Sequence, residues 1–345
     1  MPAKRVVSID ILRIIACVFI VSIHVATLNP QSTTSEWVIP VARCAVPLFF
    51  MVSGYFFSGF SQEKRKSQIK KMIWLIVLSN LLYFAYGFGM AFLYHDMTAY
   101  LANTFTLKNC ADFILFNVSP FRGHLWFLTA LLYSMLFAPF LFKRHKNVFL
   151  IGIVAVLLIA NQVLGNYSSV IWNQEIPNYF TRNFLFMGIP YFLIGHLMAK
   201  NNMQNCQLSR IGLAVGILGF SLTTLAEKFL FARMGITLQG ENYVSTIFVS
   251  IGLFLFALQF SADSTARWWS RVADIGRRYS LFIYIVHPVF VDIIKIIISK
   301  YSLPDNAFLW TALVWAASLL CAVIFYWCKS KVKAGITYKR PHQAS

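Results

Sequence analysis

The sequence predicts an all-α membrane protein, a polytopic bundle of about ten spanning helices with both termini in the cytoplasm. Three observations lead to this prediction. Of the 345 residues, 58% are hydrophobic and only 12% are charged, whereas an ordinary soluble domain carries about 25% charged residues. The apolar residues form continuous runs about as long as a membrane-crossing helix. The basic residues are concentrated between alternate runs. This composition excludes a disordered chain, a fibrous protein and a typical soluble enzyme.

Ten apolar stretches can each cross the bilayer, and strands are not expected because the runs are continuous rather than alternating. In chain order they cover residues 9–28, 41–60, 72–94, 124–142, 148–164, 184–199, 211–231, 243–261, 279–299 and 308–328. The fifth and sixth are short for a span, so their ends are less well defined. No repeat or low-complexity segment divides the chain, and we expect a single domain over residues 1–345.

The charge pattern fixes the orientation of these spans. The chain has 30 Lys and Arg against 12 Asp and Glu, a formal net charge of +18. Most of the basic residues fall in six segments that ten spans place on one side, namely 1–5, 61–71, 143–147, 200–210, 262–278 and 329–340. Basic loops face the cytoplasm, so this alternation supports ten spans and puts both termini there. The excess charge is explained by topology and by contact with lipid head groups, and no nucleic-acid role is needed.

Several familiar kinds of chemical site are absent from the sequence. None of the six cysteines forms a Cys-x-x-Cys pair, so neither a zinc site nor a disulfide framework is expected. There is no Gly-x-Ser-x-Gly elbow, no phosphate-binding glycine loop and no His-Glu-x-x-His element. We therefore expect no metal, and we look for chemistry among the polar residues inside the membrane.

The first span carries the most informative polar residues. Asp10 and Arg13 are three positions apart and can pair across one helical turn. Arg13 and His24 are eleven positions apart, which places them on one stripe of a helix, about 20° apart in direction and about 16 Å apart along the axis. The simpler interpretations are that Arg13 extends to the interface and that His24 makes a hydrogen bond to another helix. Because charges inside a bilayer are costly, we favour a functional role for the pair.

The geometry of this stripe suits one kind of reaction. A neutral imidazole can act as a general base, and a guanidinium at the cytoplasmic end can bind phosphates. A long, thin donor with phosphates at one end and a reactive group at the other would reach from Arg13 to His24. An acyl-coenzyme A has this shape.

Further polar residues lie in other spans. The second span has Arg43 near its outer end, Tyr55 inside it, and Gly54, which permits another helix to approach closely. The fourth span opens with a segment that includes Arg122, His124 and Trp126, and the ninth contains His287 followed by Pro288. Trp126 also fits an interfacial anchor, and His287 also fits a packing hydrogen bond near a kinked helix. Of these, Arg122, His124, Trp126, Tyr55 and His287 are expected to line the site or bind the acceptor.

Four sequence blocks carry a resemblance to a known family. They are Asp10-x-x-Arg13 followed by His24, the VPLFFMVSGY block at 46–55, the HLWFL block at 124–128, and a tyrosine-rich segment ending in His-Pro at 279–288. In this order they resemble the acyltransferase-3 family of bacterial integral membrane O-acyltransferases. The short basic tail, with no esterase-like domain after it, resembles the stand-alone members.

The resemblance implies a reaction and roles for individual residues. It implies acyl-CoA, usually acetyl-CoA, as the cytoplasmic donor, and a hydroxyl of a surface glycan or lipid-linked sugar as the acceptor. His24 is then the catalytic base or a transient acyl carrier, and Arg13 is its motif partner, near Asp10. Arg277 and Arg278 are expected to help Arg13 bind the donor, and Arg122 is a candidate for the acceptor side. The implied location is the bacterial inner membrane.

Two other functions remain open from the residues alone. A transporter or flippase for a lipid-linked sugar or an acyl group would often show repeated halves and broken helices, and no such repeat is visible. Acidic residues that could couple ions are also scarce inside the spans, with only Glu227 and Asp292 near span ends. A scaffold in a glycan-assembly complex would tolerate replacement of Arg13 and His24.

Overall fold

The computed structural model describes residues 5–28, 32–144, 146–236, 242–260, 267–304 and 306–338. Within these ranges the chain forms helices and no strand, which confirms the predicted all-α class. The first half contains α1 (Val7–Ala26), α2 (Thr33–Ala42), α3 (Ala45–Ser58), α4 (Gln62–Leu93), α5 (Met97–Thr104), α6 (Leu107–Phe116), η1 (Gly123–Leu125), α7 (Trp126–Arg144) and α8 (Asn147–Asn161). The second half contains η2 (Gln162–Asn166), α9 (Ser168–Ile171), η3 (Asn178–Phe180), η4 (Phe184–Gly188), α10 (Ile189–Lys200), η5 (Met203–Asn205), α11 (Arg210–Arg233), α12 (Val244–Gln259), α13 (Arg267–Tyr301) and α14 (Ala307–Tyr338).

Each of the ten predicted stretches is mostly helical over its described residues, with turns at some of the ends and within the second stretch. Eight helical segments are long and apolar enough to cross a membrane, and the segments Phe184–Lys200 and Val244–Gln259 are apolar but shorter. The stretch expected at 148–164 is longer than predicted, because η2 extends α8 as far as Asn166. The total of ten spans and the cytoplasmic location of both termini stay predictions. Parts of the basic segments, residues 1–4, 145, 262–266 and 339–340, lie outside the described residues.

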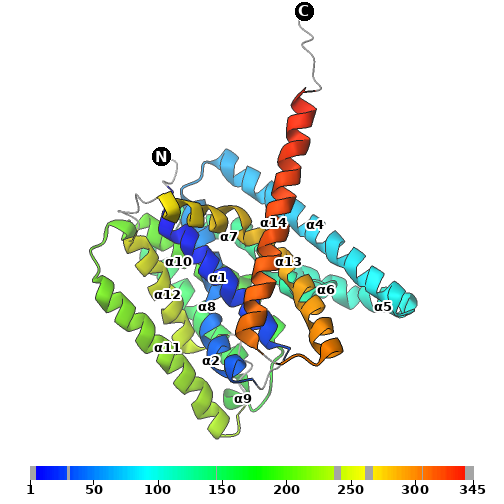
Figure 1. Cartoon of the computed structure of the whole chain (residues 1–345). Coiled ribbons are helices and arrows are strands. Elements are labelled where there is room, and N and C mark those ends of the chain that lie inside the picture. Colours follow the sequence, from blue (N-terminus) through cyan, green and yellow to red (C-terminus); the bar gives the residue numbers. More distant parts are fainter. Residues whose placement is uncertain are drawn as a thin grey trace, which may run out of the picture.

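Three helices continue beyond the apolar stretches into segments that were expected to be loops or tail. α4 begins at Gln62 rather than 72, α13 begins at Arg267 rather than 279, and α14 continues to Tyr338 rather than 328. The start of α4 is set by Ser61, whose side chain accepts a hydrogen bond from the backbone N–H of Lys64. Hydropathy locates the membrane boundary, but Lys, Arg, Gln and Glu favour the helix and carry it past that boundary. Figure 1 shows the end of α14 extending beyond the other helices.

The second predicted span is broken. α2 ends at Ala42 and α3 begins at Ala45, with Arg43 and Cys44 between them. Pro40 inside α2 cannot donate a backbone hydrogen bond, which weakens the helix at this end. The apolar segment that contains both helices covers Ser35–Ser58 rather than 41–60. Arg43 lies at the junction between the two helices.

α1 lies inside the bundle and is the element that positions the site. It packs most extensively against α13, and it also contacts α14, α2, α3 and α12 (Figure 1). The approach to α13 is close, because a Cβ atom on Gly276 would overlap the backbone carbonyl of Asp10. Cys17 and Ser280 meet along the same contact, where the thiol donates to the Ser280 carbonyl at 3.4 Å. The polar residues of α1 are therefore held against the helix that carries His287.

Candidate active site

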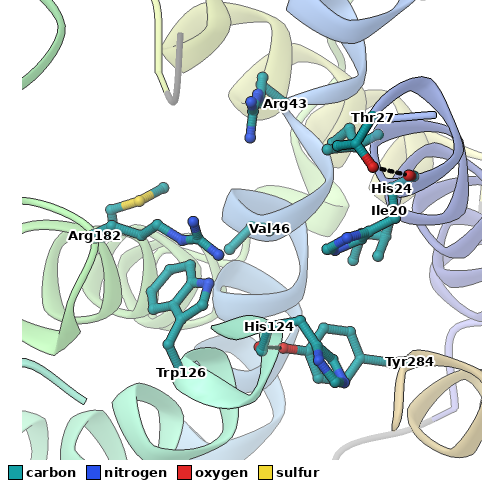
Figure 2. Close-up of a pocket in the computed structure, with 11 residues that line it drawn as sticks. Ile20, His24, Thr27, Arg43, Val46, His124, Trp126, Arg182 and Tyr284 are labelled. Atoms are coloured by element: carbon teal, nitrogen blue, oxygen red, sulfur yellow. Dashed lines mark hydrogen bonds between the residues drawn. The ribbon is translucent and has the colours of Figure 1, made fainter. Parts of the chain in front are cut away.

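A pocket of about 170 Å³ lies beside α1, where the start of α3, the short η1 helix and the middle of α13 meet. Figure 2 shows polar side chains from separate helices pointing into it. The lining residues are Ile20, Ile23, His24, Thr27, Arg43, Val46, His124, Trp126, Arg182, Met187 and Tyr284. Three of the predicted site residues, His24, His124 and Trp126, are among them.

Three histidines from distant parts of the chain meet at this pocket. The ring centroid of His24 is 4.8 Å from that of His287 and 6.1 Å from that of His124. The His124 and His287 centroids are 5.6 Å apart. His287 is buried behind the pocket, whereas His24 and His124 line it. Bases that the sequence could only place on separate spans thus form one cluster.

Backbone carbonyls of α13 hold two of these rings. His287 Nδ1 lies 3.2 Å from the Ile283 carbonyl oxygen, and His124 Nε2 lies 3.2 Å from the Ile285 carbonyl oxygen. The Ile285 carbonyl also accepts a hydrogen bond from the Tyr83 hydroxyl at 2.6 Å. Tyr284 donates to the backbone carbonyl of His124, which fixes η1 against α13. The short turn that carries His124 is therefore tied to the helix that carries His287.

Arg182 and Tyr284 line the pocket but were not predicted as site residues. The Arg182 guanidinium lies over the Trp126 ring, 5.1 Å from its centroid (Figure 2). Its backbone is fixed on both sides, since the Asn161 amide donates to the Thr181 carbonyl and Asn183 caps η4. The sequence did contain one indication of Arg182, since it is a charged residue two positions before the apolar stretch that begins at residue 184. Arg43 was recognised only as an outer charge of the second span.

Arg13 and Asp10 lie near the other end of α1, outside the pocket. Asp10 is buried and accepts from Arg13 at 2.8 Å and from Arg5 at 3.1 Å. The Arg13 guanidinium also lies 5.5 Å from the centroid of the Phe56 ring. Between Arg13 and His24 on the same stripe, Cys17 and Ile20 are buried. The pocket at His24 thus does not extend to Arg13 in this structure.

The predicted donor-binding residues Arg277 and Arg278 are exposed on α13. Arg277 pairs with Asp274 at 3.0 Å, and Asp274 in turn pairs with Arg5 at 2.9 Å. Arg277 therefore belongs to the same network of ion pairs as Arg13 and Asp10.

Arg122 and Tyr55 do not line the pocket. Arg122 pairs with Asp292 at 2.8 Å, and the Tyr86 hydroxyl donates to the other oxygen of Asp292 at 3.1 Å. The Arg122 guanidinium lies 6.0 Å from the centroid of the Tyr83 ring. The Tyr55 hydroxyl donates to Gln204 at 3.2 Å.

Comparison with known proteins identifies the family. The sequence model of the acyltransferase domain of acyltransferase-3 proteins matches residues 6–327, nearly the whole chain. The chain belongs to the acyltransferase-3 family. This acyltransferase is also similar to two proteins of Enterococcus faecalis that are each named amino-acid racemase. One is 29% identical over 205 residues, which cover 54% of this chain and 27% of that relative. The other is 25% identical over 360 residues, which cover 95% of this chain and 47% of that relative.

The acyltransferase thus spans about half the length, or less, of the curated relatives it matches. No solved structure matches it. Membership in the family supports a membrane acyltransferase, a class of enzyme that needs an acyl donor and an acceptor. Over the described residues, no group of three or more His, Cys, Asp or Glu side chains is arranged to hold a metal ion.

The ion pairs of Asp10 give a first testable prediction for the acyltransferase. Replacing Asp10 with alanine leaves the Arg13 guanidinium among helices without its carboxylate, and breaking a buried pair costs about 3–5 kcal/mol. Because the Arg13 side chain is 21% exposed to solvent, we expect a smaller loss of stability, about 1–3 kcal/mol. Thermal unfolding of the purified protein in detergent measures this loss.

The matched control is Asp112→Ala, which removes the pair with Lys108, a side chain that is 75% exposed. That change should cost well under 1 kcal/mol, about the size of a surface ion pair. Equal melting temperatures for the two variants would contradict a structural role for the Asp10 pairs.

Proposed function

We propose that this protein moves an acyl group, acetyl in the simplest case, from cytoplasmic acyl-CoA to a hydroxyl of a surface glycan or lipid-linked sugar. The acceptor hydroxyl and the thioester meet in the pocket beside His24, in the bacterial inner membrane. The observation that carries the proposal is the convergence of His24, His124 and His287 at one pocket, in a chain of the acyltransferase-3 family.

The proposed reaction needs one base at the pocket. A nitrogen of the His24 imidazole takes the proton of the acceptor hydroxyl, and the oxygen attacks the thioester carbonyl carbon. A carbon–oxygen bond forms, the carbon–sulfur bond breaks, and the coenzyme A thiolate leaves and receives the proton from His24. Transfer through an acyl-imidazole on His24 uses the same atoms in two steps. No metal is required to balance either route.

The donor side is assigned to the end of α1 that carries Arg13. The exposed Arg277 and Arg278 and the paired Arg13 supply positive charge there for the phosphates of the donor. The pantetheine arm then has to pass about 16 Å along α1 to reach His24. Cys17 and Ile20 fill this route in the structure, so donor entry requires α1 and its neighbours to separate.

The acceptor side is assigned to the rim of the pocket that Thr27, Trp126 and Arg182 line. The Arg182 guanidinium offers several N–H donors in a fixed plane, and its contact with the Trp126 ring helps to hold it there. Arg122, which contacts the Tyr83 ring and pairs with Asp292, supports the wall of the site in this proposal rather than touching the acceptor.

The test is to incubate membranes containing the protein with acetyl-CoA labelled in the acetyl group, with and without candidate lipid-linked glycans. We expect label in the glycan fraction that mild base releases as acetate, because an O-acyl ester is base-labile. Membranes lacking the protein are the control. Label that crosses sealed vesicles without any covalent product would instead support the transporter alternative and refute the proposal.

We do not propose racemisation for this chain. The curated relatives named amino-acid racemase share only about half of their length or less with it, and the match does not assign that activity to the shared half.

A further inference from the structure

His287 differs from the other two histidines of the cluster in its surroundings. Its side chain is fully buried, at 0% exposure, and it does not line the pocket. Its ring is nevertheless the nearer of the two to His24, with centroids 4.8 Å apart against 6.1 Å for His124. His287 therefore lies behind His24 as seen from the pocket, in contact with the proposed base but out of reach of a substrate.

The hydrogen bonding of His287 fixes which of its nitrogens carries the proton. A carbonyl oxygen can only accept, so the contact of Nδ1 with the Ile283 carbonyl requires Nδ1–H. In the neutral ring, Nε2 is then left with a lone pair. That atom is buried and has no hydrogen-bond partner. Buried polar atoms are nearly always paired, so an unused acceptor beside His24 calls for an explanation.

We propose that His287 is the positioning residue that orients His24, by accepting a hydrogen bond from the His24 ring at its free Nε2. Two imidazole rings joined by an N–H···N bond have centroids about 5 Å apart, which the observed separation already approaches. A small turn of the His24 ring completes the contact, and hydrogen bonds at catalytic groups often tighten only when substrate is bound. This inference rests on the proposed role of His24 as the base.

The consequence is a choice of tautomer for His24. When one of its nitrogens donates to His287, the opposite nitrogen must carry the lone pair and face the pocket, where the acceptor hydroxyl arrives. As His24 takes up the proton, its hydrogen bond to His287 becomes charge-assisted and stronger. A carboxylate fills this place in serine-protease triads. A neutral imidazole does the same without burying a negative charge among membrane helices.

His124 has a different part in this arrangement. Its Nε2 is held by the Ile285 carbonyl, and its Nδ1 is also buried without a partner. Because His124 lines the pocket and lies farther from His24, its free acceptor is assigned to a hydroxyl of the substrate rather than to His24.

The test compares two side chains of similar length at position 287. Glutamine places a carbonyl oxygen near the position of Nε2 and can accept from His24, whereas methionine offers only a weak thioether acceptor. We expect His287→Met to lower kcat about a hundredfold with KM little changed, and His287→Gln to recover most of that loss. His287→Phe, which keeps an aromatic ring, serves in place of the methionine variant if the latter does not accumulate in membranes.

A second measurement needs no substrate. Diethyl pyrocarbonate modifies the unprotonated nitrogen of histidine, and peptide mass spectrometry gives the rate at His24. We expect slower modification of His24 in His287→Met and a wild-type rate in His287→Gln. The control is His196→Met, which removes another buried histidine, one that lies in α10 and stacks on Phe142 of α7, and this change should alter neither readout.

The outcomes separate the two proposals. If the wild-type protein transfers no acyl group, the proposed function fails, while the modification rates still test the orienting contact. If transfer occurs and glutamine and methionine at position 287 behave alike in both rate and modification, His287 does not orient His24 and the inference is wrong.

Discussion

Replacing His24 with alanine should reduce acyl transfer to the background of membranes that lack the protein. The His24 imidazole is the base that α1 contributes to the pocket lining. General-base catalysis by a positioned histidine contributes about 10²–10⁴-fold to a rate. Loss of an acyl-imidazole route would remove the remainder. The rate of label transfer from acetyl-CoA to the glycan fraction measures the effect, with the amount of inserted protein determined from the same membranes.

The matched control for this prediction is His196→Ala. His196 is a buried histidine, but it stacks on Phe142 at a centroid distance of 3.6 Å and lies outside the pocket. We expect it to retain the wild-type rate per inserted molecule. Near-normal transfer by His24→Ala would exclude the proposed mechanism, and equal losses in both variants would show that any change in a buried histidine disturbs the fold.

The fold class could be predicted because the bilayer imposes a strong and simple constraint. A chain that crosses lipid must satisfy its backbone within each helix, so long apolar runs identify the helices. The same signal cannot locate their ends. α13 begins at Arg267, well before its predicted span, and α14 continues to Tyr338, well after its own. Neither extension contains a proline that would end the helix once it leaves the lipid.

For the candidate site, the sequence could predict the relative positions of residues on one helix, but not the contacts between helices. Helical periodicity placed Arg13 and His24 on one stripe of α1, and it also paired Arg13 with Asp10, as the structure confirms. It could not show that Phe56 lies against Arg13, or that only His24 of the two stripe residues lines the pocket. The contact of His24 with His287 joins residues in the first and ninth predicted spans. Such contacts depend on how helices pack, and a single sequence carries no direct record of that.

Replacing Gly54 with alanine should destabilise the protein, although alanine is the better helix former. A Cβ atom at Gly54 in α3 would overlap the backbone carbonyl of Phe192 in α10, and one at Gly195 in α10 would overlap the carbonyl of Met51 in α3. The two helices thus meet backbone to backbone, as small residues allow in membranes. Forcing them apart adds atoms to a filled space, which costs about 1–3 kcal/mol, and thermal unfolding in detergent would show a lower midpoint.

The sign of this effect separates packing from helix propensity. Gly219 in α11 has nothing within 4 Å of the position of a Cβ atom, so Gly219→Ala removes only the conformational cost of glycine. That change should leave the midpoint unchanged or raise it, by up to about 1 kcal/mol of stability. Because α3 also carries Val46 in the wall of the pocket, Gly54→Ala should lower acyl transfer per folded molecule as well. Equal stabilisation by alanine at both glycines would mean that α3 and α10 do not pack at the distance the structure shows.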